Sequence, residues 1–147
     1  MLCQFSVKNY KSIRDEVTFD MQATAISEHE DRIIKDRDGE MYLPVSAIYG
    51  PNGGGKSNVL AALHTLAAKI LRPLFATEDN GEKVLFQRRI VVEPFAFSES
   101  KNAPTEFELF FRTNSSEYRY ILHVKRDIVI YESLDRVKLE TGRRSAL

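Results

Sequence analysis

The chain of 147 residues lacks several features that would assign it to a class of protein at once. It has no tryptophan, and its single cysteine, Cys3, cannot form an internal disulfide. Its 21 lysines and arginines balance 21 aspartates and glutamates, so net charge gives no support for binding DNA, and only a local basic patch could supply it. No apolar run approaches the roughly 20 residues needed to cross a bilayer, and the first residues do not form the apolar core of a signal peptide. We therefore expect a one-domain cytoplasmic protein without a membrane partner, with Cys3 as a small core residue.

One short segment carries most of the functional information. It is Gly50-Pro51-Asn52-Gly53-Gly54-Gly55-Lys56-Ser57, which fulfils the phosphate-binding pattern G-x-x-x-x-G-K-[ST] at every fixed position. Glycines let backbone N–H groups close around the phosphates, Lys56 supplies a charge for the β- and γ-phosphates, and the Ser57 hydroxyl is placed to ligate Mg²⁺. The pattern therefore predicts that the chain binds ATP with Mg²⁺. The alternative is a glycine-rich turn that binds nothing, although such a turn needs neither the Lys-Ser pair nor so many glycines.

The residues on either side of this loop fit the pattern. Residues 43–49 form a short apolar run that predicts a buried strand leading into the loop. Apolar residues then recur at helical spacing from Val59 to Leu71, and Pro73 is expected to end that helix. Strand, glycine loop and helix, in this order, are the context in which the pattern binds phosphate.

The rest of the chain predicts mainly β-structure. Residues 2–10 and 16–21 alternate with period two and predict an N-terminal hairpin, with residues 11–15 as its turn. The charged residues 27–40 predict an exposed loop or a frayed short helix, and residues 74–87 predict a second loop. Strand-like runs separated by turn residues then predict an antiparallel meander. These runs are residues 89–93, 94–97, 105–111, 118–124 and 128–131.

The order of the elements separates this chain from many P-loop proteins. Small-molecule kinases and G-proteins usually alternate strands and helices after the loop, whereas here a hairpin precedes the loop and a meander follows it. Together with residues 5–13, 50–58, 93–95 and 117–120, this order resembles the first lobe of ABC-type ATPase heads, in the branch of the recombination and chromosome-maintenance ATPases. More narrowly, the chain resembles the ABC/AAA-family ATP-binding proteins related to the overcoming-lysogenization-defect nucleases.

This resemblance implies an α/β P-loop NTPase fold and a set of nucleotide-binding residues. Lys56 is the expected catalytic charge and Ser57 the metal ligand, and Lys11 and Ser12 approach the nucleotide from the first hairpin. For the latter two the alternative is an ordinary polar hairpin turn. Gly54 stands where such loops more often carry alanine or serine, so we expect a functional but more flexible loop. The residues expected to surround the phosphates are Asn52, Gly53, Gly55, Lys56, Ser57 and Asn58, in a loop that also contains Gly50, Pro51 and Gly54.

Related heads complete their site with groups that this sequence lacks. These are an apolar strand ending in Asp-Glu, a Ser-Gly-Gly signature loop that caps the partner's ATP, and a switch histidine. The heads also carry a glutamine after the meander, whereas Gln87 precedes it here. The run from Ile128 to Glu132 comes closest to the Asp-Glu strand, but it lacks the aspartate, and we interpret Glu132 as a strand end. Residues 1–147 are therefore expected to be a partial ATPase domain, the first lobe of a longer or split ATPase.

Two functional hypotheses remain open. In the first, a second lobe or a second copy of the head completes the site, and ATP-driven dimerisation acts on a DNA-acting or anti-phage partner such as a nuclease. In the second, the chain is a non-catalytic nucleotide-binding module in which ATP serves assembly. Because phosphoryl transfer requires a positioned water and charge stabilisation beyond the phosphate loop, we expect the isolated chain to bind ATP with negligible hydrolysis.

Overall fold

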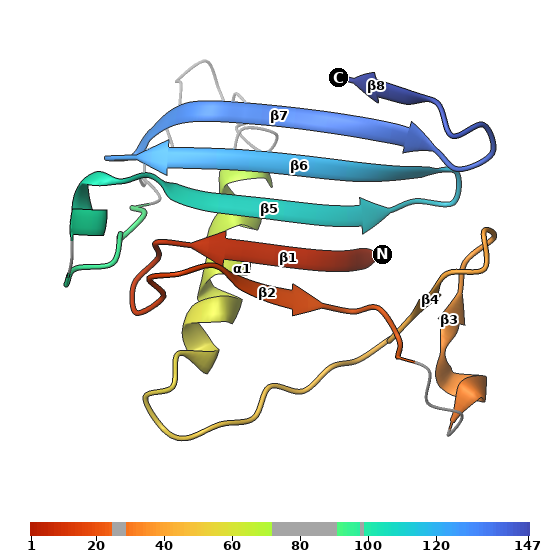
Figure 1. Ribbon diagram of the computed structural model, residues 1–147, viewed down its shortest axis with the longest axis horizontal. Helices are drawn as coiled ribbons and strands as arrows, with labels where there is room; N and C mark the ends of the chain where they lie inside the picture. Colours follow the sequence, from red (N-terminus) through yellow and green to blue (C-terminus); the bar gives the residue numbers. More distant parts are fainter. Residues whose placement is uncertain (25–28, 72–90, 98) are drawn as a thin grey trace, which may run out of the picture.

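The computed structural model describes residues 1–24, 29–71, 91–97 and 99–147. The loop predicted at 74–87, Pro73, Gln87 and the start of the strand predicted at 89–93 lie outside these residues. The main layer is a six-stranded antiparallel sheet in the order β2-β1-β5-β6-β7-β8 (Figure 1). Its strands are β1 (Leu2–Lys8), β2 (Val17–Asp20), β5 (Thr105–Arg112), β6 (Ser116–Lys125), β7 (Ile128–Lys138) and β8 (Arg144–Ala146).

The predicted hairpin and meander form a single sheet. Period-two alternation in β1 places Phe5 and Val7, each 1% exposed, on one face, and Ser6 on the other. Val7 is paired with Val17 of β2 on one side and with Phe107 of β5 on the other, which joins the N-terminal hairpin to the meander. The hairpin and the predicted strands at 105–111 and 118–124 are confirmed, and Cys3 is buried as expected.

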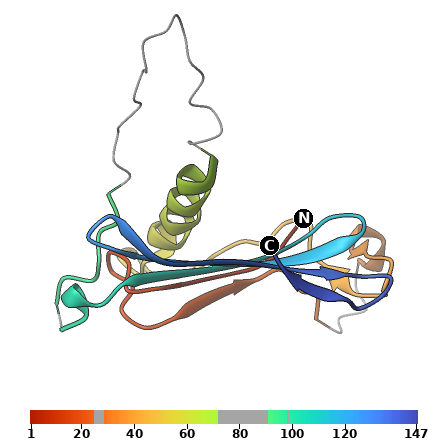
Figure 2. The ribbon, with the colours of Figure 1, turned by 90° about the horizontal axis from the view of Figure 1, so that it is seen from above.

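Helix α1 (Lys56–Leu71) lies on one face of this sheet (Figure 2). Its apolar stripe packs on the sheet through Ala62 and Leu66, which are fully buried in the same cluster as Phe5 and Val7. The Tyr10 hydroxyl and Thr65 Oγ1 are 2.9 Å apart in this interface. The predicted helix is confirmed, and it begins directly at the lysine of the phosphate loop. No helix in the described part of the chain is long and apolar enough to span a membrane.

A small hairpin follows β2 at the end of the sheet opposite to the turn between β1 and β2 (Figure 1). After a 3₁₀ turn (Glu30–Arg32), β3 (Ile34–Lys35) pairs with β4 (Met41–Tyr42). Most of residues 29–40 are exposed, as predicted, but the short strand β3 was not predicted. Two residues are too short a run to show a period of two, so no alternation could reveal it.

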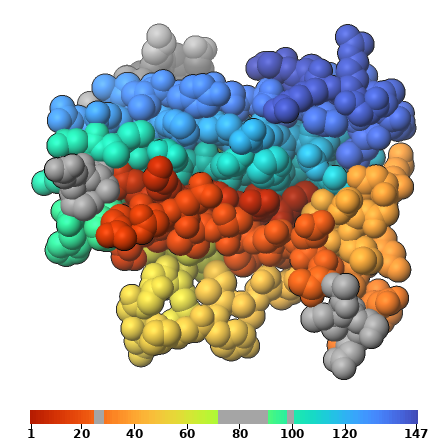
Figure 3. Space-filling model, in the orientation of Figure 1, coloured from red at the N-terminus to blue at the C-terminus, as the bar shows by residue number. Residues whose placement is uncertain are grey.

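The buried strand predicted at 43–49 is wrong. These residues form no strand, and Val45 and Tyr49 are 78% and 90% exposed. The apolar run predicted a buried strand, but such a strand needs a neighbouring strand to pair with, and none of the described strands pairs with this segment. Figure 3 shows the segment and the phosphate loop, in yellow, projecting beyond the edge of the sheet.

Three further strand predictions, at 89–93, 94–97 and 128–131, are corrected. Residues 91–97 lie outside the sheet, and the 3₁₀ turn that follows is Glu99–Asn102. Pro94 has no N–H for a ladder, and the N–H of Phe95 donates to the side chain of Asn9. The strand predicted at 128–131 continues to Lys138 as β7, so Glu132 lies within the strand and not at its end. Its carboxylate accepts a hydrogen bond from the Tyr120 hydroxyl at 2.6 Å.

Candidate nucleotide-binding site

The phosphate loop turns directly into the first turn of α1. Gly53 and Gly55 have φ values of +81° and +83°, in the left-handed region that residues with a Cβ rarely adopt. The N–H of Gly54 donates to the carbonyl of Pro51 at 3.1 Å, and the N–H of Asn58 donates to the carbonyl of Gly55 at 2.9 Å. The loop is therefore a tight turn that ends on a helix N-terminus, where free N–H groups and the helix dipole favour an anion.

Gly54 lies close to the backbone carbonyl of Pro51. A Cβ at this position would lie 3.1 Å from the carbonyl oxygen of Pro51, closer than most such contacts. The missing side chain therefore permits this turn, and the expected flexibility of the loop stays a prediction.

The side-chain ammonium of Lys56 is hydrogen-bonded to the start of the phosphate loop. Its Nζ donates to the carbonyl oxygens of Gly50 and Pro51, each at 2.8 Å. Phosphate oxygens are stronger acceptors than neutral carbonyls for an ammonium group. The same Nζ can therefore exchange these carbonyl partners for the oxygens of a bound phosphate. Ser57 is exposed at the next position of the helix, where its hydroxyl is open to a metal ion. Asn52 is exposed in the loop.

The turn of the first hairpin contacts the phosphate loop. Asn58 Nδ2 donates to Ser12 Oγ at 2.7 Å, and a Cβ on Gly55 would lie 3.4 Å from the same Ser12 oxygen. Ser12 thus lies beside the loop. The ammonium of Lys11 instead lies 5.5 Å from the ring centroid of Tyr10, and Lys11 does not line the groove at the loop. The nucleotide-binding role of Lys11 and Ser12 stays a prediction.

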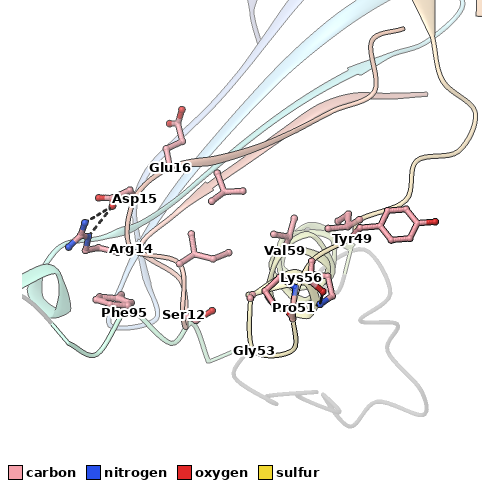
Figure 4. Close-up of a pocket in the computed structure, with 16 residues that line it drawn as sticks. Ser12, Arg14, Asp15, Glu16, Tyr49, Pro51, Gly53, Lys56, Val59 and Phe95 are labelled. Atoms are coloured by element: carbon pink, nitrogen blue, oxygen red, sulfur yellow. Dashed lines mark hydrogen bonds and ion pairs between the residues drawn. The ribbon is translucent and has the colours of Figure 1, made fainter. Parts of the chain in front are cut away.

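A groove of about 730 Å³ opens between the loop and the hairpin (Figure 4). This volume lies in the range of typical small-molecule sites. Its lining includes residues that were not assigned to the site from the sequence, although Ile13 and Phe95 lie in segments that carry the resemblance. These unassigned residues are Ile13, Arg14, Asp15, Glu16 and Val17 from the hairpin, Ile48 and Tyr49 before the loop, Val59 of α1, and Phe95.

The charges on the hairpin side of the groove largely satisfy one another. Arg14 donates to Asp15 Oδ2 through Nε at 3.0 Å and through its NH2 nitrogen at 2.8 Å. This hydrogen bond lowers the pKa of the Asp15 carboxyl, which therefore stays ionised at neutral pH. Because Arg14 is paired with Asp15, we assign the contact with phosphate to Lys56, whose ammonium lies within the phosphate loop.

This arrangement defines a nucleotide-binding site of the P-loop class, because it combines positive-φ glycines, a lysine and a helix N-terminus. A family model described as "AAA domain, putative AbiEii toxin, Type IV TA system" matches residues 45–145, more than half of the chain. The chain belongs to this AAA family of P-loop ATPases, whose members bind nucleotide, usually with Mg²⁺. A comparison with curated proteins found no match.

Proposed function

We propose that the chain binds ATP with Mg²⁺ as the first lobe of an ABC-type ATPase head. One observation carries this proposal: the first hairpin contacts the segment formed by the phosphate loop and α1, although the two are far apart in the sequence. The contact is the hydrogen bond between Asn58 and Ser12. A glycine-rich turn that binds nothing has no need of a second segment placed against it. The loop, Lys56 and Ser57 supply the phosphate and metal contacts, and Ser12 closes the groove from the hairpin.

The proposed head is completed by a second lobe or by a second copy of the head. Hydrolysis requires a group that positions the attacking water, and the sequence has no apolar strand ending in Asp-Glu to provide it. The exposed segment at 43–49 supports the same proposal, because its apolar residues are of the kind that a neighbouring strand covers. ATP would then act by bringing the parts of the site together.

The wider role that we propose is in an anti-phage or DNA-acting assembly whose effector is a nuclease or a toxin. This proposal rests on the resemblance to the nuclease-linked ATPases and on the family description, which names a toxin of a type IV TA system. The balanced charge of the chain favours an assembly in which another component contacts DNA.

The proposal is tested by thermal melting with and without ligand. A ligand that binds the native state raises the melting temperature, and the rise is larger for tighter binding at the same ligand concentration, so ATP with Mg²⁺ should stabilise the chain more than ATP with EDTA. Ser57→Ala should remove the Mg²⁺-dependent part of this shift, whereas Ser46→Ala, an exposed serine in the preceding segment, should leave it unchanged. No shift with ATP and Mg²⁺ in the wild type would refute the proposed function.

A further inference from the structure

The groove contains one half-buried aromatic side chain on the hairpin side, that of Phe95. The phosphate loop forms the other side of the groove, so a nucleotide whose phosphates lie on the loop has its base outside the loop. Figure 4 shows Phe95 beside Ser12 and Arg14, at a distance from the loop. An aromatic ring at this end of the groove is suited to contact a base.

The second aromatic residue in the lining, Tyr49, is less suited to this role. Its side chain is 90% exposed, and Figure 4 shows its ring directed away from the hairpin side of the groove. It also belongs to the segment that no described strand supports. A ring without neighbours loses more conformational freedom when a ligand orders it, which reduces its contribution to binding.

Phe95, in contrast, is fixed in place by the hairpin. Its N–H donates to Asn9 Oδ1 at 3.0 Å, and two residues earlier the carbonyl of Glu93 accepts from the N–H of Lys11 at 2.8 Å. Asn9 is itself 2% exposed, and its Nδ2 donates to the carbonyl of Ala103 at 3.0 Å. The segment that carries Phe95 is thereby attached to the same turn that brings Ser12 to the phosphate loop.

We infer that Phe95 is a base-stacking residue of the nucleotide site, and this inference rests on the proposed function. Its ring presents an aromatic face to the base, while the loop holds the phosphates. Stacking on an aromatic side chain contributes about 1–3 kcal/mol per base, or about 5- to 150-fold in affinity, and tolerates any base. The ring therefore adds affinity for the nucleoside part of ATP and none for the triphosphate part.

The test compares ATP with inorganic tripolyphosphate, which has the phosphates but no base, both with Mg²⁺. Phe95→Ala should weaken ATP binding about 5- to 150-fold and leave tripolyphosphate binding unchanged. Tyr131→Ala is the matched control, because Tyr131 is a half-exposed aromatic residue of β7 that is not part of the groove lining; Phe97 cannot serve, since its ring lies 5.8 Å from that of Phe95. Equal weakening of both ligands by Phe95→Ala would overturn the inference, because the residue would then act through the fold.

A spectroscopic arm avoids any loss of folding in the alanine variant. The chain has no tryptophan, so the variants Phe95→Trp and Tyr49→Trp each contain a single tryptophan whose fluorescence can be followed. ATP should quench the emission of Phe95→Trp, whereas tripolyphosphate should not. Quenching by ATP only in Tyr49→Trp would place the base on the other side of the loop and overturn the inference. Failure of the wild type to bind either ligand would instead refute the proposed function itself.

Discussion

Asn9 joins three segments of the chain through one buried residue. Its side chain donates to the carbonyls of Ala103 and Pro104 at 3.0 and 3.1 Å and accepts from the N–H of Phe95 at 3.0 Å. Its own carbonyl accepts from Thr105 Oγ1 at 2.6 Å. The φ of Asn9 is +55°, a conformation that asparagine tolerates better than most residues. The residue therefore sets the position of the hairpin turn that contacts the phosphate loop.

Replacing Asn9 is expected to destabilise the whole fold. Asn9→Ala leaves two carbonyls and an N–H without these partners in a buried place, so the free energy of unfolding should fall by about 2–4 kcal/mol. Urea unfolding followed by circular dichroism measures the change. Asn102→Ala, at an exposed asparagine of the neighbouring 3₁₀ turn, should change stability by no more than about 0.5 kcal/mol. Equal stabilities of the two variants would contradict the role assigned to Asn9.

At the scale of elements, the sequence predicted the longer strands of the main sheet but not β3, β4 and β8, which have two or three residues each. Phe107 of β5 and Val124 of β6 each stand between two polar residues because one face of these strands belongs to the core cluster that includes α1, and that alternation is visible in the sequence. The apolar run around Val45 looks the same in composition, yet no described strand pairs with it, so composition alone could not place it. Phe95 could not be placed either, because the hydrogen bond that its N–H donates to the side chain of Asn9 leaves no pattern in the sequence.

The same holds for the site. The loop from Gly50 to Ser57 was predictable because its chemistry demands fixed residue types at fixed spacing. The approach of Ser12 was predicted by resemblance, and the structure places it beside the loop. The other hairpin residues along the groove could not be predicted, since the hairpin meets the loop and α1 through contacts between distant segments, Tyr10 with Thr65 and Ser12 with Asn58.

The β3–β4 hairpin is held to the sheet by Arg112 of β5. The guanidinium, whose side chain is 10% exposed, contacts Asp38 and Glu117 at 2.7 Å and Asp36 at 3.4 Å. It also lies 5.4 Å from the ring centroid of Tyr42. Burial lowers the pKa of Arg112, but the hydrogen bond to Glu117 and the neighbouring charges outweigh it and raise the pKa overall, so the side chain stays charged.

Removing this side chain should release the small hairpin. In Arg112→Ala the two aspartates lose their partner on the sheet, so hydrogen exchange in residues 29–42 should accelerate and overall stability should fall by about 1–3 kcal/mol. Arg144→Ala removes a single exposed ion pair with Asp135 and should cost less than about 1 kcal/mol. Unchanged exchange in residues 29–42 of Arg112→Ala would show that other contacts hold the hairpin.

At the scale of the whole molecule, large apolar side chains are exposed around the phosphate loop. Val45, Tyr49 and Leu60 are 78%, 90% and 59% exposed. They belong to the segment before the loop and to α1, on the part of the chain that projects beyond the sheet (Figure 3). Exposed apolar groups of this kind recruit a partner, which we propose to be the second lobe or a second copy of the head.

We expect the isolated chain to self-associate through this surface. Light scattering should show an average mass that rises with protein concentration, and the double variant Tyr49→Ser, Leu60→Gln should reduce the rise because it removes apolar area. Ile130→Gln, on the exposed part of β7, is the control for association through that strand. A monodisperse wild-type monomer that melts cooperatively would contradict the expectation, and loss of association only in Ile130→Gln would assign it to β7.

Binding of ATP at the phosphate loop is tested most directly by calorimetry on three proteins. The wild type should bind ATP with Mg²⁺, and Lys56→Ala should bind it at least about tenfold more weakly, because a charge-assisted hydrogen bond to phosphate is lost. Lys69→Ala, at the other end of the same helix, should bind like the wild type. Absence of binding by the wild type at millimolar ATP, or equal affinity of the wild type and Lys56→Ala, would contradict nucleotide binding at this site.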